Sequence, residues 1–358
     1  MTMLNVALIF GGRRAEHDVS VRSARLVYEA LDRKHYFPIL IGVAQDGKWW
    51  LQENADSFPS EVDTSGGQIV FLPGAQGRAV VHRHDGEERI CKEKICHVNV
   101  VFPVLWDGLL QGILETAQVP FIGSRLPVPG ICLNKQMTKR ILRDAGLPIA
   151  RSLLVTSGEE VNFQSAQKAL CSSALFVKPT SLHSSIGISK VTCETEFQAA
   201  VDLAFNYGSN ILVEEYVEAR ELECAILQDA ERPNQLLCSW PGEIILSDQH
   251  AFFTYEAKIE GSGVTMKTKA ELDRAVADRV RDLACEAFRV IGCEGLARVD
   301  FFMRKNGELL INEVCAVPNL TPISMFSRMI EGSGIPYNVL VQRLFEEALM
   351  RSERARAA

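Results

Sequence analysis

A near-continuous apolar run close to the start of the chain, Asn5–Phe10, limits the folds that this sequence can adopt. Strands buried on both faces have this composition, whereas strands with one wet face alternate apolar and polar residues. Gly11 and Gly12 follow as a turn, Val19–Leu31 has the apolar spacing of a helix, and Phe37–Val43 is apolar again. This order of strand, glycine turn, helix and strand predicts the start of an open α/β sheet.

Further along the chain, segments with strand spacing alternate with segments of helical spacing. Gly66–Arg89 reads as a hairpin, Val98–Leu105 as another buried strand and Gln111–Thr116 as the start of a helix, before a proline-rich connection at Leu126–Pro129. The later strands expected are Leu175–Lys178, Gly187–Thr192, Ile211–Val217, Leu222–Leu227, Gly242–Leu246, Gly295–Phe302 and Glu308–Val314. The later helices expected are Asn134–Asp144, Lys269–Ile291 and Asn338–Arg351, with Ser352–Ala358 frayed. Such alternation predicts several α/β units.

Charge and composition argue against several classes of protein. A net charge of −7 argues against a nucleic-acid partner, because nucleic-acid binders usually present a basic face. No apolar stretch approaches the roughly 20 residues that span a membrane, and the first apolar run lacks the features of a signal peptide. The ten cysteines form no CxxC pair, as is typical of reduced thiols. We therefore expect a cytoplasmic protein without nucleic-acid or membrane partners.

Two carboxylates and a guanidinium occur on a predicted β-hairpin in the last third of the chain. Arg298 and Asp300 are two residues apart, so both project from one face of their strand, and Asn312 and Glu313 lie on the paired strand. Charged groups are costly to bury on an apolar hairpin without a role, and Mg²⁺ bridging nucleotide phosphates would supply one. A surface Arg–Asp pair would give the same pattern, so both readings stay open on these residues alone.

A second candidate site is the strand end Phe176–Pro179, followed by the small-residue loop Ser184–Gly187. Loops of this kind expose backbone N–H groups to phosphate, and Lys178 adds a positive charge. The segment is not a Walker A motif, which needs Gly-x4-Gly-Lys-Ser/Thr. A solvated strand end with a flexible loop is the alternative reading.

A third candidate is the apolar strand Ile211–Val217, which runs into acidic residues that include Glu221. The backbone of such a segment can meet the adenine edge of a nucleotide while a carboxylate meets the ribose hydroxyls. An ordinary exposed strand end is equally compatible with these residues.

A fourth candidate is Gly11–His17, between the first strand and the first helix, where α/β folds bind ligands. The dinucleotide pattern G-x-G-x-x-G is absent. Glu16 could pair with a substrate ammonium group, or it could be an acid favoured by the dipole of the helix that follows.

Taken together, these segments closely resemble the D-alanine–D-alanine ligase family of ATP-grasp enzymes. The resemblance runs from Val6 to Ser333, and the order and spacing of so many segments make it specific. The matching stretches are FGGRRAEHDVSVRSA, VFPV with DGLLQGILE, NKQMTKRILRDAGLP, FVKP with SSIGISKV, ILVEEYVEARELECAIL, YEAK, GLARVDFF and NEV followed by PNLTPIS. It implies an α/β ATP-grasp fold with an N-terminal substrate-side domain over residues 1–125, a central lid over 126–212 and a C-terminal catalytic and metal-binding domain over 213–358.

The resemblance also implies an ATP-dependent ligase that forms a peptide bond between two amino acids. In the family, ATP phosphorylates the carboxylate of one D-alanine, and the amine of a second D-alanine attacks the acyl phosphate. The dipeptide serves peptidoglycan synthesis and cell-wall biogenesis. The expected cofactors are ATP and one or two Mg²⁺ ions, which Mn²⁺ can replace, and the expected assembly is a homodimer.

Matching positions imply particular roles for individual residues. The residues expected to bind ATP are Lys135, Lys178 and Lys258 at the phosphates, Glu214, Tyr216 and Val217 at the adenine, and Glu221 at the ribose. The residues expected to bind the metal are Asp300 and Glu313, with Cys315 doubtful. Those expected in catalysis or at the amino acids are Glu16 at the first ammonium, Ser184 at the first substrate and its lid, Arg298 at the transferring phosphoryl group, and Ser324 and Met325 at the second carboxylate.

The sequence departs from the usual family pattern mainly in segments that face the substrates. Leu105–Gly108 replaces a longer segment, His-Gly-x-x-Gly-Glu-Asp-Gly. The other unusual residues are Cys315 in place of a metal-site Asn, Asn319 in place of Gly, Ile259 in place of Tyr, and Leu182 with His183 before the serines. Three functions therefore stay open: a D-alanine–D-alanine ligase, a relative that joins a different amino acid or amine in a specialised pathway, and a nucleotide-binding protein with little turnover.

Overall fold

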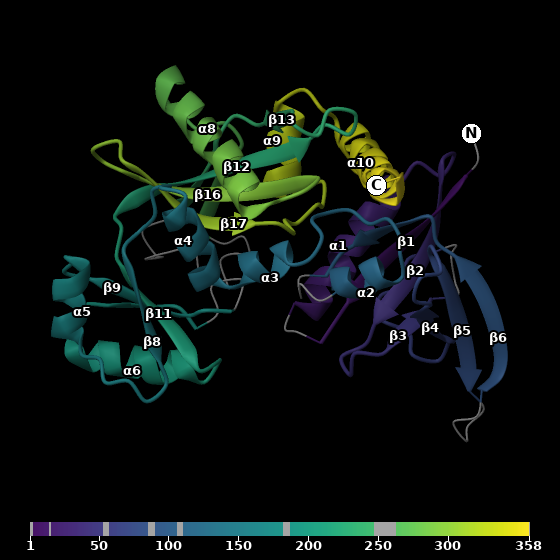
Figure 1. The fold of residues 1–358 in the computed structure, drawn as a ribbon, viewed down its shortest axis with the longest axis horizontal. Helices are drawn as coiled ribbons and strands as arrows, with labels where there is room; N and C mark the ends of the chain where they lie inside the picture. The colour runs from purple at the N-terminus through teal and green to yellow at the C-terminus, as the bar shows by residue number, and fades with distance from the viewer. Residues whose placement is uncertain are drawn as a thin grey trace.

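The computed structural model describes residues 3–13, 16–52, 57–84, 90–105, 110–181, 187–246 and 263–357. Three sheets and their helices organise these residues, and Figure 1 shows the first sheet at the opposite end of the molecule from the second. In this part of the chain, no helix combines the length and apolar character that crossing a membrane requires.

The first sheet confirms the open α/β arrangement expected near the N-terminus. Its strand order is β6-β5-β4-β3-β2-β1-β7, and β1 pairs in parallel with β2 and β7. The strands are β1 (Leu4–Gly11), β2 (Tyr36–Val43), β3 (Trp49–Leu51), β4 (Gln68–Phe71), β5 (Arg78–His84), β6 (Ile90–His97) and β7 (Val100–Pro103). Val6 and Leu8 pack in one core with α1 (His17–Ala30), and Ala7 and Ile9 pack in another with α2 (Leu110–Thr116). Both faces of β1 are covered, so its apolar run is continuous.

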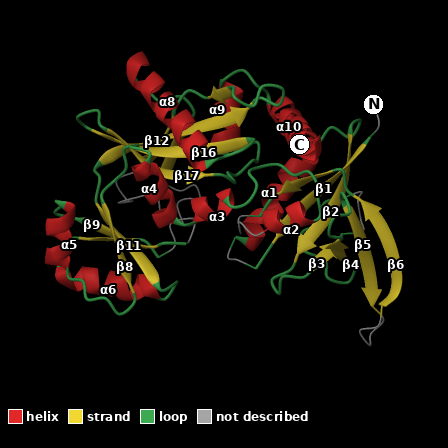
Figure 2. Cartoon of the chain, in the orientation of Figure 1, coloured by secondary structure: helices red, strands yellow, loops and turns green. Residues whose placement is uncertain are grey.

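The second sheet is antiparallel, with strand order β10-β9-β11-β8. Its elements are β8 (Ser152–Thr156), α5 (Phe163–Leu170), β9 (Leu175–Pro179), β10 (Ser189–Val191), α6 (Glu194–Phe205) and β11 (Asn210–Glu215). Helices α5 and α6 share one apolar core with the strands. Figure 2 shows both helices beside this sheet. Apolar spacing predicted β9, β10 and β11. It did not predict β8, α5 or α6, in which polar residues dilute that spacing.

The third sheet has the order β15-β14-β12-β16-β17, with β13 paired to β12. Its strands are β12 (Ala219–Gln228), β13 (Leu236–Cys238), β14 (Gly242–Leu246), β15 (Val264–Lys267), β16 (Leu296–Arg304) and β17 (Leu309–Cys315). Helix α8 (Arg274–Ile291) shares an apolar core with β12, β16 and β17, while α9 (Met325–Gly332) packs in the core that includes the first sheet.

Chain segments cross between these sheets. Helices α3 (Val128–Leu133) and α4 (Lys135–Asp144) precede the second sheet in sequence but pack in the core of α8. Helix α10 (Tyr337–Ala357) packs through Phe345 on Phe102 of the first sheet, with ring centroids 5.9 Å apart. The divisions at residues 125 and 212 stay predictions, and the second of them falls within β11.

The end of the chain, from Ser352 onward, was expected to be frayed. This expectation is wrong for residues 352–357, because α10 continues to Ala357. Arg354 donates a hydrogen bond of 2.8 Å to the carbonyl of Ala230, and Arg356 donates one of 3.1 Å to the carbonyl of Gln118. These long-range contacts anchor the last turns of the helix, and no local pattern could reveal them.

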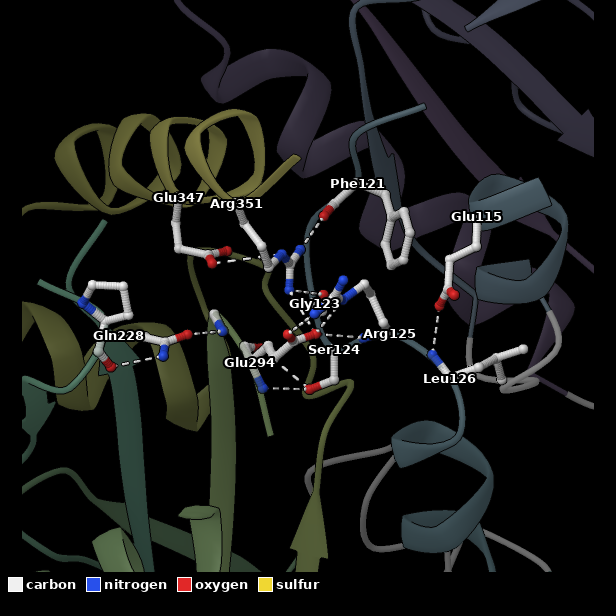
Figure 3. Close-up of polar contacts among 12 residues, drawn as sticks. Glu115, Phe121, Gly123, Ser124, Arg125, Leu126, Gln228, Glu294, Glu347 and Arg351 are labelled. Carbon is white, nitrogen blue, oxygen red and sulfur yellow. Dashed lines mark hydrogen bonds and ion pairs between the residues drawn. The ribbon is translucent and has the colours of Figure 1, made fainter. Parts of the chain in front are cut away.

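A buried arginine joins this last helix to the first and third sheets (Figure 3). Arg351 donates hydrogen bonds to the carbonyls of Phe121 at 2.7 Å and Gly123 at 2.8 Å. Its guanidinium also lies 3.5 Å from the carboxylate of Glu294, which Arg125 contacts at 2.6 and 2.9 Å. Because Glu294 lies just before β16, the cluster fixes the position of that strand relative to the first sheet.

We expect Arg351→Met to lower the free energy of unfolding by roughly 3–5 kcal/mol, because it leaves buried acceptors and a carboxylate without their cation. Arg343→Met, at an exposed position of the same helix, is the matched control and should change it by less than about 0.5 kcal/mol. Urea denaturation of both variants measures the difference. Equal free energies of unfolding would show that the Arg351 cluster does not hold the sheets together.

Candidate active site

Three carboxylates form a row across neighbouring strands of the third sheet. In the strand register, Glu223 of β12 lies opposite Asp300 of β16, and Asp300 lies opposite Glu313 of β17. Their neighbours Val299 and Val314 are buried in the core with α8. Because side chains alternate along a strand, the three carboxylates project from the face that is turned away from α8.

A bulge in β17 brings Glu313 into this row. Phe301 lies opposite Ile311, but Asp300 lies opposite Glu313, so Asn312 is an extra residue between the two pairs. Without the extra residue, Glu313 would lie opposite Val299 and would face the core. Such bulges redirect side chains and are common next to active sites.

Arg298 compensates the negative charge of the row. Its guanidinium donates two hydrogen bonds to the carboxylate of Asp300, at 2.7 and 2.8 Å, and its Nε lies 3.5 Å from Glu223. Burial acts to lower the pKa of Arg298, but Asp300 and Glu223 together raise that pKa well above its usual value. Arg298 therefore stays charged and holds Asp300 in a fixed orientation.

Cys315 lies opposite Arg298 at the end of the same strand pair. Burial raises the pKa of the Cys315 thiol to about 12, although Arg298 acts in the opposite direction. A thiol of this pKa is protonated at neutral pH, and a neutral thiol is a poor ligand for a hard cation such as Mg²⁺. Cys315 is therefore not suited to bind Mg²⁺.

The remaining carboxylates suit a metal that is shared with a substrate. Among the described residues, no group of three or more His, Cys, Asp or Glu side chains is arranged to hold a metal ion by itself. Mg²⁺ in phosphoryl-transfer sites is commonly held by one or two carboxylates together with substrate phosphates. Asp300 and Glu313, side by side on β16 and β17, fit that donor set.

A second buried charge cluster lies on the second sheet. Glu214 of β11 is only 2% exposed and accepts contacts from two lysines. Lys139 of α4 approaches its Oε1 at 2.9 Å, and Lys178 of β9 approaches its Oε2. Burial acts to raise the pKa of Glu214, but the two lysines lower it below its usual value, so the carboxylate stays ionised.

The residues expected at the nucleotide lie around these clusters. Lys135 begins α4, and its backbone N–H donates to the carbonyl of Thr180 at 2.8 Å, which ties that helix to the end of β9. Val217 is buried in a small apolar cluster with Leu310 and Phe302, and Glu221 lies opposite Phe302 in the register of β12 and β16. An apolar cluster therefore lies beside the strand pair that carries the Glu221 carboxylate.

Other expected residues lie on different elements. Glu16 is at the N-terminal cap of α1, and Tyr216 follows β11, with the Lys190 ammonium 3.7 Å from its ring centroid. Ser324 caps α9 by accepting a hydrogen bond from the Ser327 N–H, and Met325 is buried in the core with the first sheet. Asn319 accepts a hydrogen bond from the Thr321 N–H at 2.9 Å. Ser184, Lys258, Leu182, His183, Ile259 and the segment 106–108 lie outside the described residues.

Two residues in these clusters were not identified from the sequence. Glu223 follows Glu221 in the pattern ELE, whose alternation places both on one face, and that signal was available. Lys139 is one turn after Lys135 on a helix rich in charged residues, where a buried lysine cannot be told from an exposed one. A cavity of about 780 Å³ between the start of α8 and the β16–β17 turn contains none of the expected site residues.

The fold and the site define an ATP-grasp carboxylate–amine ligase, and the chain is an enzyme of this class. The model of the D-Ala–D-Ala ligase N-terminus matches residues 5–124, and that of the C-terminus matches residues 141–346. The chain belongs to the D-alanine–D-alanine ligase family. The family, the fold and the enzyme class expected from the sequence are thus confirmed.

Relatives match over nearly the full length of the chain. D-alanine–D-alanine ligase A from Mesorhizobium japonicum is 41% identical over 98% of this chain and 98% of its own. The structure of the D-alanine–D-alanine ligase from Coxiella burnetii matches with a TM-score of 0.84 at 28% identity, over 99% and 96% of the two chains. The VanG D-Ala:D-Ser ligase from Enterococcus faecalis matches with a TM-score of 0.81 at 28% identity, over 97% and 100%.

The carboxylate row predicts strong coupling between Arg298 and Asp300. Arg298→Met should lower the free energy of unfolding by roughly 3–5 kcal/mol, because it leaves Asp300 and Glu223 without the guanidinium. Adding Asp300→Asn should recover part of that loss, with a coupling energy of roughly 1–3 kcal/mol in a double-mutant cycle. Lys305→Met, at a side chain that is 83% exposed, is the control and should be neutral. Strict additivity of Arg298→Met and Asp300→Asn would contradict the pairing.

Proposed function

We propose that this enzyme joins two molecules of D-alanine and uses ATP to activate the carboxylate of the first. The observation that carries the proposal is the Arg298–Asp300–Glu313 arrangement on one face of β16 and β17, in a chain that matches D-alanine–D-alanine ligases along its whole length. A charged arginine beside two carboxylates is suited to phosphoryl transfer, which depends on positioning and on charge compensation.

In this proposal, the nucleotide binds between the second and third sheets. Lys135, Lys178 and Lys258 bind its phosphates, and Glu221 binds the ribose. The backbone of the segment that contains Glu214, Tyr216 and Val217 meets the adenine edge, which leaves the Glu214 carboxylate to the two lysines. Asp300 and Glu313 would hold Mg²⁺, which would supply positive charge for the phosphate oxygens. Mn²⁺ would be held by the same oxygen ligands.

Arg298 is proposed to stabilise the negative charge that develops on the transferred phosphoryl group and on the intermediate's oxygen. Its contact with Asp300 fixes the guanidinium before the substrates bind, so it needs no reorganisation during the reaction. Glu16 is proposed to hold the ammonium group of the first amino acid, with Ser184 near that substrate. Ser324 and Met325 are proposed to meet the carboxylate of the second one.

A relative that joins a different amino acid or amine in a specialised pathway is the second candidate. It is favoured by the unusual residues Cys315 and Asn319, and by the similarity to a structure named as a D-Ala:D-Ser ligase. The altered positions lie in segments assigned to the substrates, whereas the lysines assigned to ATP are retained. In either case, we propose a cytoplasmic enzyme. The first candidate supplies a dipeptide for peptidoglycan, and the second acts in a specialised pathway.

We also propose that the enzyme acts as a homodimer. A row of apolar side chains crosses the outer strands of the first sheet, where Val70 pairs with Val80 and Val80 with Ile95. Val70 is 51% exposed and Ile95 is 66% exposed, and exposed apolar rows of this kind support association.

The function is tested by measuring ADP release from the purified enzyme with Mg-ATP and single or paired amino acids. We expect D-alanine alone to stimulate ADP release and mass spectrometry to detect the dipeptide D-Ala-D-Ala. Turnover only when D-alanine is paired with D-serine or another amine would favour the second candidate. Absence of turnover with every pair would contradict a ligase.

We expect Asp300→Asn to lower turnover by roughly 10³-fold or more while the fold persists, because the variant removes a negative ligand oxygen from the metal. Asp282→Asn, at an exposed acid on α8, is the matched control and should leave turnover unchanged. Steady-state ADP release measured against Mg²⁺ concentration gives the comparison. Normal turnover in Asp300→Asn would remove the metal assignment.

A further inference from the structure

Glu214 lies between two lysines that come from different parts of the chain. Lys139, Glu214 and Lys178 are 2%, 2% and 7% exposed, so all three are buried. Each carboxylate oxygen of Glu214 forms an ion pair with one lysine, Oε1 with Lys139 and Oε2 with Lys178. The cluster therefore holds two cations and one anion in a space from which water is largely excluded.

The charges of this cluster do not cancel. The pKa of Glu214 is lowered, so its carboxylate is ionised at neutral pH, and the three groups carry a net charge of +1 when both lysines are protonated. Burial lowers the pKa of Lys139, Glu214 acts to raise it, and Lys178 and Arg143 lower it further. Surplus charge in a buried cluster is costly unless an opposite charge is supplied, so the cluster is suited to an anion.

We propose that Lys139 is a positioning residue that neutralises Glu214 and so leaves the positive charge of Lys178 available to a nucleotide phosphate. The inference rests on the proposed function, in which Lys178 binds phosphate. Lys139 acts through Glu214, because its own Nζ is directed to that carboxylate and its side chain is only 3% exposed. Without Lys139, the negative charge of Glu214 would be balanced by Lys178 alone.

The placement of α4 explains how Lys139 can hold Glu214 in position. One side of the helix packs through Leu142 in the core with α8, and Lys139 reaches from the helix to β11 of the second sheet. The backbone bond from Lys135 to Thr180 holds the start of the helix against the end of β9. The lysine is thus presented from a rigid element, which limits the number of positions that the Glu214 carboxylate can take.

The test compares the binding of ADP and of adenosine, because only ADP carries the phosphates. Lys139→Met should weaken ADP binding about tenfold or more and leave adenosine binding within about twofold, since a lost charge acts on the phosphate. Competition calorimetry without amino acids gives both affinities. Arg140→Met, at an exposed cation on the same helix, is the matched control and should bind both ligands like the unmodified enzyme.

A charge-rescue variant separates this role from a structural one. Lys139→Met with Glu214→Gln removes one charge of each sign and keeps the net charge at +1, so it should recover most of the ADP affinity. Lys139→Arg should also retain it. These two variants test the inference even if Lys139→Met does not fold.

Several outcomes would overturn the inference. They are unchanged ADP binding in Lys139→Met, an equal loss of ADP and adenosine binding, and weak ADP binding in the charge-rescue variant. Failure of the unmodified enzyme to bind ADP or ATP would instead contradict the proposed function, so the two failures can be told apart.

Discussion

Compensation of buried charge is the constraint on which the rest of this structure depends. Charged groups in an apolar surrounding are stable only when partners satisfy them, and loss of one partner costs several kcal/mol. Arg298 satisfies Asp300 on the third sheet, and Glu214 is held between two lysines on the second. Arg351 plays the equivalent part where α10 meets the first and third sheets. The surrounding cores fix the backbone, and these charge pairs fix the side chains that it presents.

The strand register aligns residues that are distant in sequence into the row of carboxylates. Part of this register could be predicted from the sequence, and part could not. Continuous apolar runs predicted β1, and alternation placed Arg298 and Asp300 on one face, because both signals are local. The bulge at Asn312 has no comparable signal, yet it decides that Glu313 faces Asp300 and not the α8 core. The hairpin pattern made Glu313 a candidate metal ligand, and the resemblance to a known family implied the same role, but neither local signal showed which face of the sheet Glu313 occupies.

Contacts between residues that are distant in sequence also could not be predicted from the sequence. The buried state of Lys139 depends on Glu214, which belongs to a different sheet, and helical spacing alone gives no reason to bury a lysine. The persistence of α10 to Ala357 depends on carbonyls at Gln118 and Ala230. In both cases the local residues are compatible with exposure, and only the assembled fold supplies the partner.

The two charge clusters have opposite signs, and this difference links them to a single chemistry. Glu223, Asp300 and Glu313 with Arg298 carry a net charge of −2 when all are ionised, while the Glu214 cluster carries +1. A divalent cation would balance the first cluster, and an anionic phosphate would balance the second. Because the Cys315 thiol has a pKa of about 12, it adds no charge at neutral pH, and the balance of the row does not depend on it. At position 315 the family usually has an asparagine, so this chain has one neutral side chain in place of another. The metal-binding proposal therefore rests on the carboxylates of Asp300 and Glu313 alone.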